Sequence, residues 1–486
     1  MSGDQHQTSY PSVLLHIGGE WRAADSGRIG EVLNPATQDV IGYYAHAGIL
    51  DLDLALAAAE HGFQSWKRVS AFERCRVMRR AAEILRQRCD QIATWMTIEQ
   101  GKPIAEARAE VMAGADIIEW FAEEGRRSYG RVIPARVPAV RQLTVKEPVG
   151  VVVAFTPWNF PINQAVRKIS AALAAGCSIV LKAPEETPAA PAELVRAFVD
   201  AGLPAGALNL VYGTPGEISN HLIASPVVRK ISFTGSTAVG KQLAALAGVH
   251  MKRATMELGG HTPVVVLRDA NVDAAARITA AAKFRNAGQV CVSPTRFLIE
   301  EPVYDRFVDT FHQATKSVKV GSGLEPETTM GPLANARRIE AIDGMVHDAI
   351  QSGAELVAGG QVVGNRGYFY EPTILSRVPT AARVMNEEPF GPVALMVPLP
   401  SLEAIIAEAN RLNFGLASYA FTRSAAAVNR LTDEIAAGML SVNHTGLALP
   451  EVPFGGINDS GNGTEGGADA LEPYLNTKFV THRSDA

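Results

Sequence analysis

The chain has 486 residues, of which 47% are apolar and 20% charged, an ordinary globular balance that allows two or three domains. Its 45 basic and 50 acidic residues give a net charge of −5 without any basic block, so the composition does not indicate a nucleic-acid-binding surface. The four cysteines are scattered, with no pair or cluster of the kind that metal sites and disulfide frameworks need. This pattern indicates a reducing compartment.

The N-terminal segment Met1–Ser12 is polar and lacks the apolar core of a signal peptide. The longest apolar runs are too short to span a bilayer. We therefore expect a cytoplasmic protein with no metal site and with neither nucleic acid nor membrane as a partner.

An Arg-rich stretch at residues 74–88 is the first strong pattern along the chain. Apolar residues fall at helical spacing from Val77 to Ile92. We interpret the stretch as one amphipathic helix with a solvated basic face, in preference to a binding patch.

The segment from Ser128 to Lys146 differs from its neighbours. Gly130, Pro134 and Pro138 separate short β-prone pieces that have no helical period. This predicts an extended hairpin. Because a hairpin alone is marginal in water, it would need a partner chain.

From Val149 onward, apolar β-prone runs alternate with helical stretches. The first region predicts strands at Val149–Phe155, Ser178–Lys182, Leu208–Tyr212 and Lys230–Phe233, with helices at Ile162–Ala175 and Ala189–Asp200. A second region, from about Thr262 to Ser460, predicts strands at Pro263–Leu267 and Arg296–Ile299 and helices at Val272–Arg285 and Ser401–Arg411. Strands and helices that alternate at this spacing predict βαβ units and a parallel sheet in each region. The predicted fold class is α/β.

Cys291 closes the segment Asn286–Cys291, which follows a predicted helix and contains a glycine. Such a loop can expose a thiol and aim backbone N–H groups at it, which would suit a nucleophile. The alternative is a small buried hydrophobic residue, the interpretation we adopt for Cys75, Cys89 and Cys177.

Two further polar residues lie at predicted strand ends. Glu257 precedes the paired glycines Gly259 and Gly260, which permit close approach, and is either a water-activating base or an ordinary surface carboxylate. Asn159 follows the strand that ends at Phe155, beyond the edge where open parallel sheets bind ligands. Its amide can stabilise an oxyanion or cap the next helix.

The segment Phe233–Lys241 leads from a predicted strand through a glycine loop into a helix, which turns free N–H groups toward an anion. It is neither GxGxxG nor a P-loop, and a tight turn explains it nearly as well. Lys182 and Glu185 follow another strand end, where they can hold ribose hydroxyls.

Taken together and in this order, these segments resemble the aldehyde dehydrogenase superfamily. The resemblance rests on Thr156–Pro161, Lys182 with Glu185, Phe233–Gly240, Glu257–Gly260, Gly288–Cys291, Glu387–Pro392 and Pro453–Gly456. It covers about Leu14 to Val480. It implies a Rossmann-type dinucleotide-binding domain (residues 1–127 and 149–258), an α/β catalytic domain (259–465) and a small β oligomerisation element (128–148 and 470–486). A homodimer or homotetramer is therefore expected.

The resemblance also implies the chemistry, which is oxidation of an aldehyde to a carboxylate through a thioester on Cys291. Glu257 would be the general base, and Asn159 with the backbone N–H of Cys291 would hold the oxyanion. Lys168 and Glu465 would relay the proton of the base to solvent. The implied cofactor-binding residues are Thr156, Trp158, Lys182, Glu185, Gly235, Ser236, Glu388 and Phe390.

The implied cofactor is NAD, with NADP possible. Glu185 would lie where the 2′-phosphate of NADP falls, and like charges repel, so we expect NAD to be preferred.

Within the superfamily the sequence most resembles the succinate-semialdehyde dehydrogenase group. Arg167 and Arg285 match the two arginines that this group uses on the substrate carboxylate, and Phe160 and Phe454 are further expected substrate contacts. Two buried guanidinium groups need an anion, although each can pair with a protein carboxylate instead.

The sequence departs from this group at two positions. The tail-binding serine of the group is Ala448 here, and its redox cysteine is Ser293, so we expect no disulfide switch. A longer ω-oxo acid, a general aliphatic or aromatic aldehyde, and a non-redox thiol esterase activity therefore stay open. Glu257 argues against a CoA-acylating enzyme, because a water-activating base would compete with thiol transfer.

Overall fold

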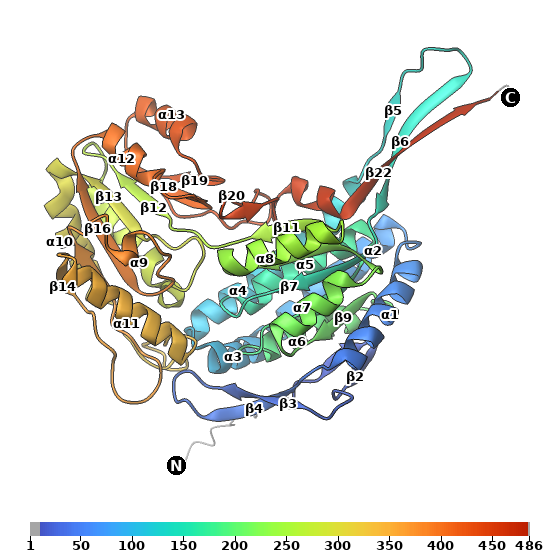
Figure 1. The fold of residues 1–486 in the computed structure, drawn as a ribbon, viewed down its shortest axis with the longest axis horizontal. Helices are drawn as coiled ribbons and strands as arrows, with labels where there is room; N and C mark the ends of the chain where they lie inside the picture. The colour runs from blue at the N-terminus through green and yellow to red at the C-terminus, as the bar shows by residue number, and fades with distance from the viewer. Residues whose placement is uncertain (1–9, 485–486) are drawn as a thin grey trace.

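The computed structural model describes residues 10–484. The polar N-terminus and the ends of the predicted segments 1–127 and 470–486 therefore extend outside the described residues. Two α/β bodies lie side by side, and a three-stranded arm projects from one of them (Figure 1). Each body has its own sheet and its own apolar core. The predicted α/β fold class is confirmed.

The first sheet has eight strands in the order β2-β1-β9-β8-β7-β10-β11-β21. They are β1 (Leu15–Ile17), β2 (Glu20–Arg22), β7 (Val151–Phe155), β8 (Ser178–Lys182), β9 (Leu208–Val211), β10 (Val228–Thr234), β11 (Arg253–Glu257) and β21 (Gly461–Asn462). The strands from β9 to β11 are parallel and almost wholly buried, which explains their continuous apolar sequences.

The strand order of this sheet reverses between β7 and β10, because β8 and β9 follow on one side of β7 and β11 follows on the other side of β10. In open α/β sheets, ligands bind beyond the carboxyl ends of the strands at such a reversal. The segments that leave β7 and β10 are therefore the expected walls of a binding site.

The helices of the first body surround this sheet. They are α1 (Ile49–Trp66), α2 (Ala71–Gln87), α3 (Cys89–Gln100), α4 (Ile104–Glu124), α5 (Pro161–Ala175), α6 (Ala189–Asp200), α7 (Pro215–Ala224) and α8 (Thr237–Val249). Helix α5 starts with Pro161 in its first turn and ends at Gly176, whose φ of 92° is left-handed and suits glycine.

The Arg-rich stretch 74–88 lies in helix α2 and its C-cap, as predicted, although the apolar pattern up to Ile92 continues into a second helix, α3. Helix α2 ends and α3 begins at Arg88, whose φ of −96° and ψ of 9° interrupt the helical hydrogen-bond ladder. On α2, Arg76 and Arg80 form ion pairs with Glu73 and Glu83 at the exposed surface, so the basic face is solvated as predicted.

The second sheet has seven strands in the order β14-β15-β16-β13-β12-β18-β19, all parallel except β14 at the edge. They are β12 (Pro263–Val266), β13 (Arg296–Glu300), β14 (Glu355–Ala358), β15 (Thr373–Ser376), β16 (Val393–Leu399), β18 (Ala417–Phe421) and β19 (Met439–Val442). The helices of this body are α9 (Val272–Phe284), α10 (Tyr304–Thr315), α11 (Ala336–Gln351), α12 (Leu402–Ala409) and α13 (Ala425–Glu434). Two small antiparallel pairs, β3 (Ile29–Leu33) with β4 (Val40–Ala45) and β17 (Phe414–Gly415) with β20 (Ile457–Asn458), lie outside the main sheets.

The arm consists of β5 (Arg131–Ile133), β6 (Val140–Pro148) and β22 (Leu475–Arg483), all antiparallel. The hairpin predicted between Ser128 and Lys146 is therefore confirmed, and the C-terminal strand completes it. Apolar side chains remain uncovered on the arm, with Val132 90% and Phe479 55% exposed.

The predicted domain boundaries stay a prediction. The first apolar core is built from residues on either side of the arm, and the second core lies between Val264 and Phe454. Strand β21, however, falls within the predicted catalytic segment 259–465 and pairs with β11 of the first sheet. Within residues 10–484, no helix is both long and apolar enough to cross a membrane.

Candidate active site

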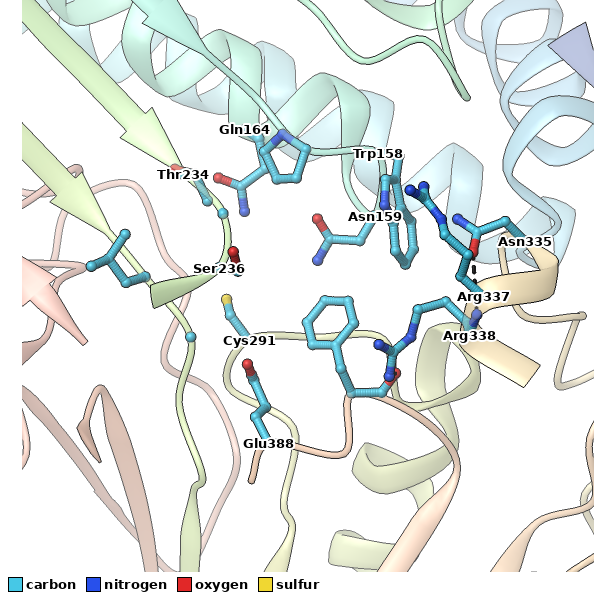
Figure 2. A pocket seen from close by; sticks show the side chains of 15 residues that line it. Trp158, Asn159, Gln164, Thr234, Ser236, Cys291, Asn335, Arg337, Arg338 and Glu388 are labelled. Atoms are coloured by element: carbon cyan, nitrogen blue, oxygen red, sulfur yellow. Dashed lines mark hydrogen bonds between the residues drawn. The ribbon is translucent and has the colours of Figure 1, made fainter. Parts of the chain in front are cut away.

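Two cavities share the Cys291 side chain. The larger, of about 540 Å³, is shown in Figure 2, where Cys291, Asn159 and Glu388 turn toward one space. It is lined by Pro157, Trp158, Asn159, Gln164, Thr234, Gly235, Ser236, Leu258, Gly259, Cys291, Asn335, Arg337, Arg338, Glu388 and Phe390. The smaller, of about 290 Å³, is lined by Glu106, Ala109, Glu110, Ala113, Phe160, Asn163, Gln164, Arg167, Arg285, Val290, Cys291, Val292, Ala448 and Phe454. A thiol at the junction can face a cofactor on one side and a substrate on the other.

The loop that carries Cys291 has an unusual backbone. Helix α9 ends at Phe284, and the residues Asn286, Ala287 and Gly288 then take left-handed φ values of 48°, 52° and 70°. A Cβ atom at Gly288 would lie 2.1 Å from the carbonyl oxygen of Gly391, so only glycine fits there. Left-handed non-glycine residues are uncommon and tend to gather at functional sites.

The Cys291 thiol is held in its protonated form by its surroundings. Burial, and then the carboxylates of Glu257 and Glu388, raise the pKa of this thiol to about 12. A positive charge in the adjoining cavity would oppose these effects and favour the thiolate.

Asn159 sits in the turn after β7 and reaches toward the Cys291 loop. Its Nδ2 donates to the carbonyl of Gln289 at 3.1 Å, and its Oδ1 is buried without a hydrogen-bond partner among the described residues. Helix α5 begins after Phe160 and receives no cap from the Asn159 side chain, so the capping interpretation was wrong. The second N–H of the amide stays available for an oxyanion.

Glu257 ends β11 and is 2% exposed, which excludes the surface-carboxylate interpretation. It is absent from the lining of both cavities, but its charge acts on Cys291. Its carboxylate packs closely on Gly455, where a Cβ atom would lie 3.2 Å from the Glu257 Oε1. Burial and the neighbouring Glu465 raise the pKa of Glu257, whereas Lys168 and Arg167 oppose the shift. A carboxylate with a raised pKa is suited to general-base chemistry near neutral pH.

Lys168 and Glu465 form a buried ion pair, and the charges of both act on Glu257. Lys168 also donates to Thr234 Oγ1 at 2.7 Å, and Ser232 donates to Glu465 Oε1 at 2.9 Å. The second carboxylate oxygen, Oε2 of Glu465, has no hydrogen-bond partner among the described residues. These contacts join Lys168 to Glu465, whereas no hydrogen bond or ion pair within residues 10–484 joins Glu257 to either of them, so the relay stays a prediction.

The predicted cofactor-binding residues lie only partly in the larger cavity. Its lining includes Trp158, Gly235, Ser236, Glu388 and Phe390 but not Thr156, Lys182 or Glu185. The Oγ1 of Thr156 is buried without a partner in the described range, and the Ser236 side chain makes no capping bond at the start of α8, so both hydroxyls are available to a ligand. Lys182 and Glu185 follow β8 and lie 2.5 Å apart as an ion pair. Trp158 and Phe390 meet edge to face with ring centroids 5.7 Å apart and form an aromatic wall.

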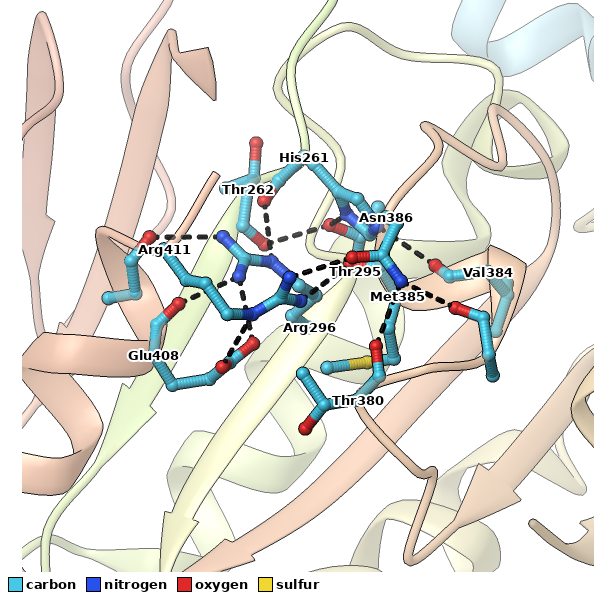
Figure 3. A network of polar contacts seen from close by, with 12 residues as sticks. His261, Thr262, Thr295, Arg296, Thr380, Val384, Met385, Asn386, Glu408 and Arg411 are labelled. Carbon is cyan, nitrogen blue, oxygen red and sulfur yellow. Dashed lines mark hydrogen bonds and ion pairs between the residues drawn. The ribbon is translucent and has the colours of Figure 1, made fainter. Parts of the chain in front are cut away.

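Glu388 enters this cavity from a loop of the second body. It accepts from the Gly260 N–H at 3.1 Å, and burial raises its pKa to about 7. A polar network holds the segment just before it (Figure 3): His261 contacts the Val384 carbonyl at 2.9 Å, and Arg411 donates to the Asn386 side chain at 2.7 Å.

The predicted substrate residues surround the smaller cavity. Arg167 is 5% exposed, donates to the carbonyls of Glu465 and Ala448, and stacks over Phe454 with 5.0 Å between guanidinium carbon and ring centroid. Its hydrogen bonds thus go to backbone oxygens, and neither is to a carboxylate.

Arg285 is exposed, so the prediction that it is buried was wrong. Helix α9 ends one residue earlier, which leaves Arg285 at the edge of the cavity. Its guanidinium carbon lies 5.3 Å from the Phe160 ring centroid, and no hydrogen bond or ion pair joins it to another residue within 10–484. The carboxylate of Glu106 lines the same cavity, however, and the charge of Arg285 opposes the rise that burial causes in the pKa of Glu106, so the alternative that Arg285 pairs with a protein carboxylate stays open.

Several lining residues were not predicted from the sequence. Gln164 touches both cavities, and Arg337 and Arg338 lie across the larger cavity from Thr234 and Ser236 (Figure 2). The paired arginines at the start of a helix were a visible signal. The segment across the cavity from them, which contains Thr234 and Ser236, is about a hundred residues away in the sequence, so no local pattern connects the two.

Comparison with known proteins gives the family. The sequence model described as "Aldehyde dehydrogenase family" matches residues 21–480. The chain is 49% identical to 4-(hydroxymethyl)benzenesulfonate dehydrogenase TsaD1 of Comamonas testosteroni, over 97% of this chain and 98% of that protein. It is 41% identical to succinate-semialdehyde dehydrogenase [NADP(+)] GabD of Escherichia coli (strain K12), over 96% of each.

Solved structures agree. The crystal structure of succinate-semialdehyde dehydrogenase from Burkholderia pseudomallei superposes with a TM-score of 0.96 at 39% identity, covering 99% of this chain and 100% of that one. The predicted resemblance is therefore confirmed. The chain belongs to the aldehyde dehydrogenase family and is an NAD(P)-dependent aldehyde dehydrogenase.

Proposed function

We propose that this enzyme oxidises an aldehyde with an anionic group at its far end, such as succinate semialdehyde or another ω-oxo acid, through a thioester on Cys291. The observation that carries the proposal is the position of Cys291 at the junction of two cavities. One cavity is lined by part of the predicted cofactor-binding set, and the other is bordered by Arg167 and Arg285.

In the proposed mechanism, the Cys291 thiolate attacks the aldehyde carbon. The free amide N–H of Asn159 and the backbone N–H of Cys291 hold the resulting oxyanion. NAD or NADP, when bound in the larger cavity, would supply positive charge and the acceptor for the hydride that leaves the oxyanion adduct. Glu257 then takes a proton from the water that attacks the thioester, which releases the carboxylic acid and frees the Cys291 sulfur. Lys168 and Glu465 pass this proton on to solvent.

Cofactor binding is assigned by the same proposal. Lys182 and Glu185 would hold the adenosine ribose, Thr156, Trp158, Gly235 and Ser236 would surround the pyrophosphate side, and Glu388 and Phe390 would hold the nicotinamide ribose. Glu185 is followed by Glu186, a second carboxylate, which forms an ion pair with Arg337 at 3.3 Å. Because the carboxylate of Glu185 would repel a 2′-phosphate, we propose that NAD is preferred over NADP.

The anionic substrate is supported by charge and by the relatives. An unpaired guanidinium at a cavity edge attracts an anion, and Phe160 places a flat apolar surface beside it. The relative at 49% identity is named for a benzenesulfonate and the relative at 41% for succinate semialdehyde, and both compounds carry an anion. The walls formed by Phe160 and Phe454 also favour a second candidate, an aromatic aldehyde with an anionic substituent.

Replacement of the nucleophile and the base tests the chemistry. Cys291→Ala is expected to abolish NADH formation, whereas Glu257→Gln is expected to give about one NADH per subunit in a rapid burst and then a steady rate lowered by a factor of about 100. Both are read by absorbance. Cys89→Ala, at a thiol of similar partial burial, is the matched control and should keep full activity. Turnover by Cys291→Ala would refute the proposal.

A substrate panel tests the anionic class. For aldehydes with a terminal carboxylate or sulfonate, Arg285→Ala is expected to lower kcat/KM about 10- to 100-fold, because one charge-assisted contact is lost. For uncharged aldehydes, kcat/KM of the Arg285→Ala variant should equal that of the wild type. Arg277→Ala, at an exposed arginine on helix α9, which ends just before Arg285, is the control. Equal losses of kcat/KM on charged and uncharged aldehydes would contradict the role of Arg285 in binding an anion. The same panel, run once with NAD and once with NADP, tests the cofactor preference.

The assembly and location remain parts of this proposal. We propose that the arm joins copies of the chain into a homodimer or homotetramer, and that the enzyme is cytoplasmic. The exposed apolar side chains of the arm support the first statement.

A further inference from the structure

Lys102 is a fully buried lysine beside the catalytic turn, and the proposed mechanism gives it no role. It lies in the loop between α3 and α4. Its ammonium donates to Glu110 Oε2 at 2.6 Å and to the backbone carbonyl of Asn159 at 2.7 Å, and lies 4.1 Å from the centroid of the Phe160 ring. The side chains of Lys102 and Glu110 are 0% and 1% exposed. The ammonium therefore binds the very residue whose amide would hold the oxyanion.

The Lys102 loop is fixed in place by close backbone contacts. Gly101 has a left-handed φ of 97°. A Cβ atom at Gly323 would lie 2.3 Å from the Lys102 carbonyl oxygen, and one at Gly331 would lie 1.9 Å from that of Gly101. The Ile104 N–H also donates to the Gly323 carbonyl at 2.9 Å. The lysine therefore projects from a backbone with little freedom to shift.

The orientation of Asn159 depends on its backbone. The side-chain amide makes a single hydrogen bond, to the Gln289 carbonyl, which by itself does not fix its position. Its backbone carbonyl, in contrast, accepts from two buried donors, Lys102 and Asn286, the latter at 2.9 Å. These two donors determine where the amide reaches.

Glu110 extends the same arrangement to helix α5. Its Oε1 accepts from the N–H groups of Ile162 and Asn163 at 2.9 and 3.1 Å. These bonds satisfy the first turn of α5, whose own N-cap residue, Phe160, provides no side-chain cap. The Lys102–Glu110 pair thus ties the Asn159 turn to the start of the helix that carries Arg167 and Lys168.

Stability alone does not account for this pair. Removing two charges from water costs several kcal/mol each, and apolar or neutral replacements of a whole buried pair are often neutral for stability. Precise placement of a reacting group is worth more, since a shift of about 1 Å can cost about 100-fold in rate. We propose that Lys102, held by Glu110, is a positioning residue that fixes Asn159 as the oxyanion donor. The inference rests on the proposed role of Asn159.

The double variant Lys102→Met with Glu110→Gln tests this without leaving a buried charge unpaired. The amide that replaces the Glu110 carboxylate keeps an acceptor oxygen for the Ile162 and Asn163 N–H groups. We expect kcat to fall at least about tenfold. The Kd for NADH, measured by fluorescence titration, should change less than about twofold, because Lys102 is absent from the lining of the larger cavity.

A mutant cycle with Asn159→Ala separates positioning from general damage. Asn159→Ala alone should lower kcat about 100-fold or more. If Lys102 acts through Asn159, adding the double variant to Asn159→Ala should lower kcat by less than about twofold further. Losses that multiply would overturn the inference. Full activity of Asn159→Ala would instead refute the oxyanion role on which it rests, so the two failures are distinguishable.

Two further variants complete the design. Lys252→Met is the matched control, because Lys252 also donates to two backbone carbonyls, at 2.8 and 2.7 Å, but at the opposite end of β10; its kcat should match wild type. If the double variant fails to fold, Asn286→Gly removes the other donor to the Asn159 carbonyl and suits the left-handed backbone. It should show the same coupling with Asn159→Ala, and additive losses there would overturn the inference.

Discussion

At the scale of single residues, the site is defined by groups whose charges oppose one another. Cys291 lies near two carboxylates that disfavour its thiolate, and Glu257 shares a buried pocket with Glu465. The pKa of each group is therefore raised in the protein, that of the Cys291 thiol to about 12. In the proposed mechanism, a bound nicotinamide cofactor would bring a positive charge near the thiol, which would link cofactor binding to the reactivity of Cys291.

This linkage predicts the pH dependence of Cys291 alkylation. The thiol is an acid whose pKa is raised to about 12, so its reactive thiolate fraction should rise about tenfold for each pH unit from 7 to 10, without a plateau. Iodoacetamide labelling of the cofactor-free protein, followed by mass spectrometry of the Cys291 peptide, measures this. A small-molecule thiol should level off above pH 9 under the same conditions. A plateau near pH 8.5 for Cys291 would contradict the expected shift.

Residue types were predictable from the sequence, but their surroundings only in part. A strand end before paired glycines drew attention to Glu257, and a turn after a strand drew attention to Asn159; the structure buries both side chains. The burial of Arg285 was wrongly predicted, because the end of α9 falls one residue before it. Lys102 was missed because its partner Asn159 is 57 residues away, and a lysine after Gly101 looks like any solvated turn residue.

At the scale of elements, the parallel strands were the most predictable. Their apolar runs are buried on both faces and bounded by glycine or polar residues, so the bounds of β8 match the predicted range. The helix α6 also matches its predicted range. The three-residue strands β1 and β2 were not predicted, because so short an edge strand has no measurable alternation. The break at Arg88 was missed because the apolar period continues across it.

The arm allows a prediction about assembly. Val132→Glu places a charge on an apolar position that is 90% exposed and should convert the proposed oligomer into smaller species, because buried unpaired charge is costly at an interface. Light scattering after size-exclusion chromatography measures the mass. Val249→Glu, at a 78% exposed valine away from the arm, is the control and should leave the mass unchanged. An unchanged mass for Val132→Glu would exclude this part of the arm from the interface.

At the scale of the whole molecule, the two sheets were predictable and their relative placement was not. Alternating strands and helices indicate parallel sheets, but the reversal between β7 and β10 depends on which side each crossover takes. That reversal brings the ends of β7 and β10 together at one cavity. The sequence contains no local signal for it, which is why family resemblance was needed to group the site residues.

The division of the site between two cores affects how the enzyme fails. Cys291 and Glu388 belong to the second body, whereas Asn159 and Ser236 belong to the first. A small separation of the two bodies would move the Cys291 sulfur away from the Asn159 amide, while the helices and strands of both bodies stay folded. On heating, activity would then be lost at a lower temperature than secondary structure. Activity would report on the contact between the two bodies, whereas secondary structure would report on each body by itself.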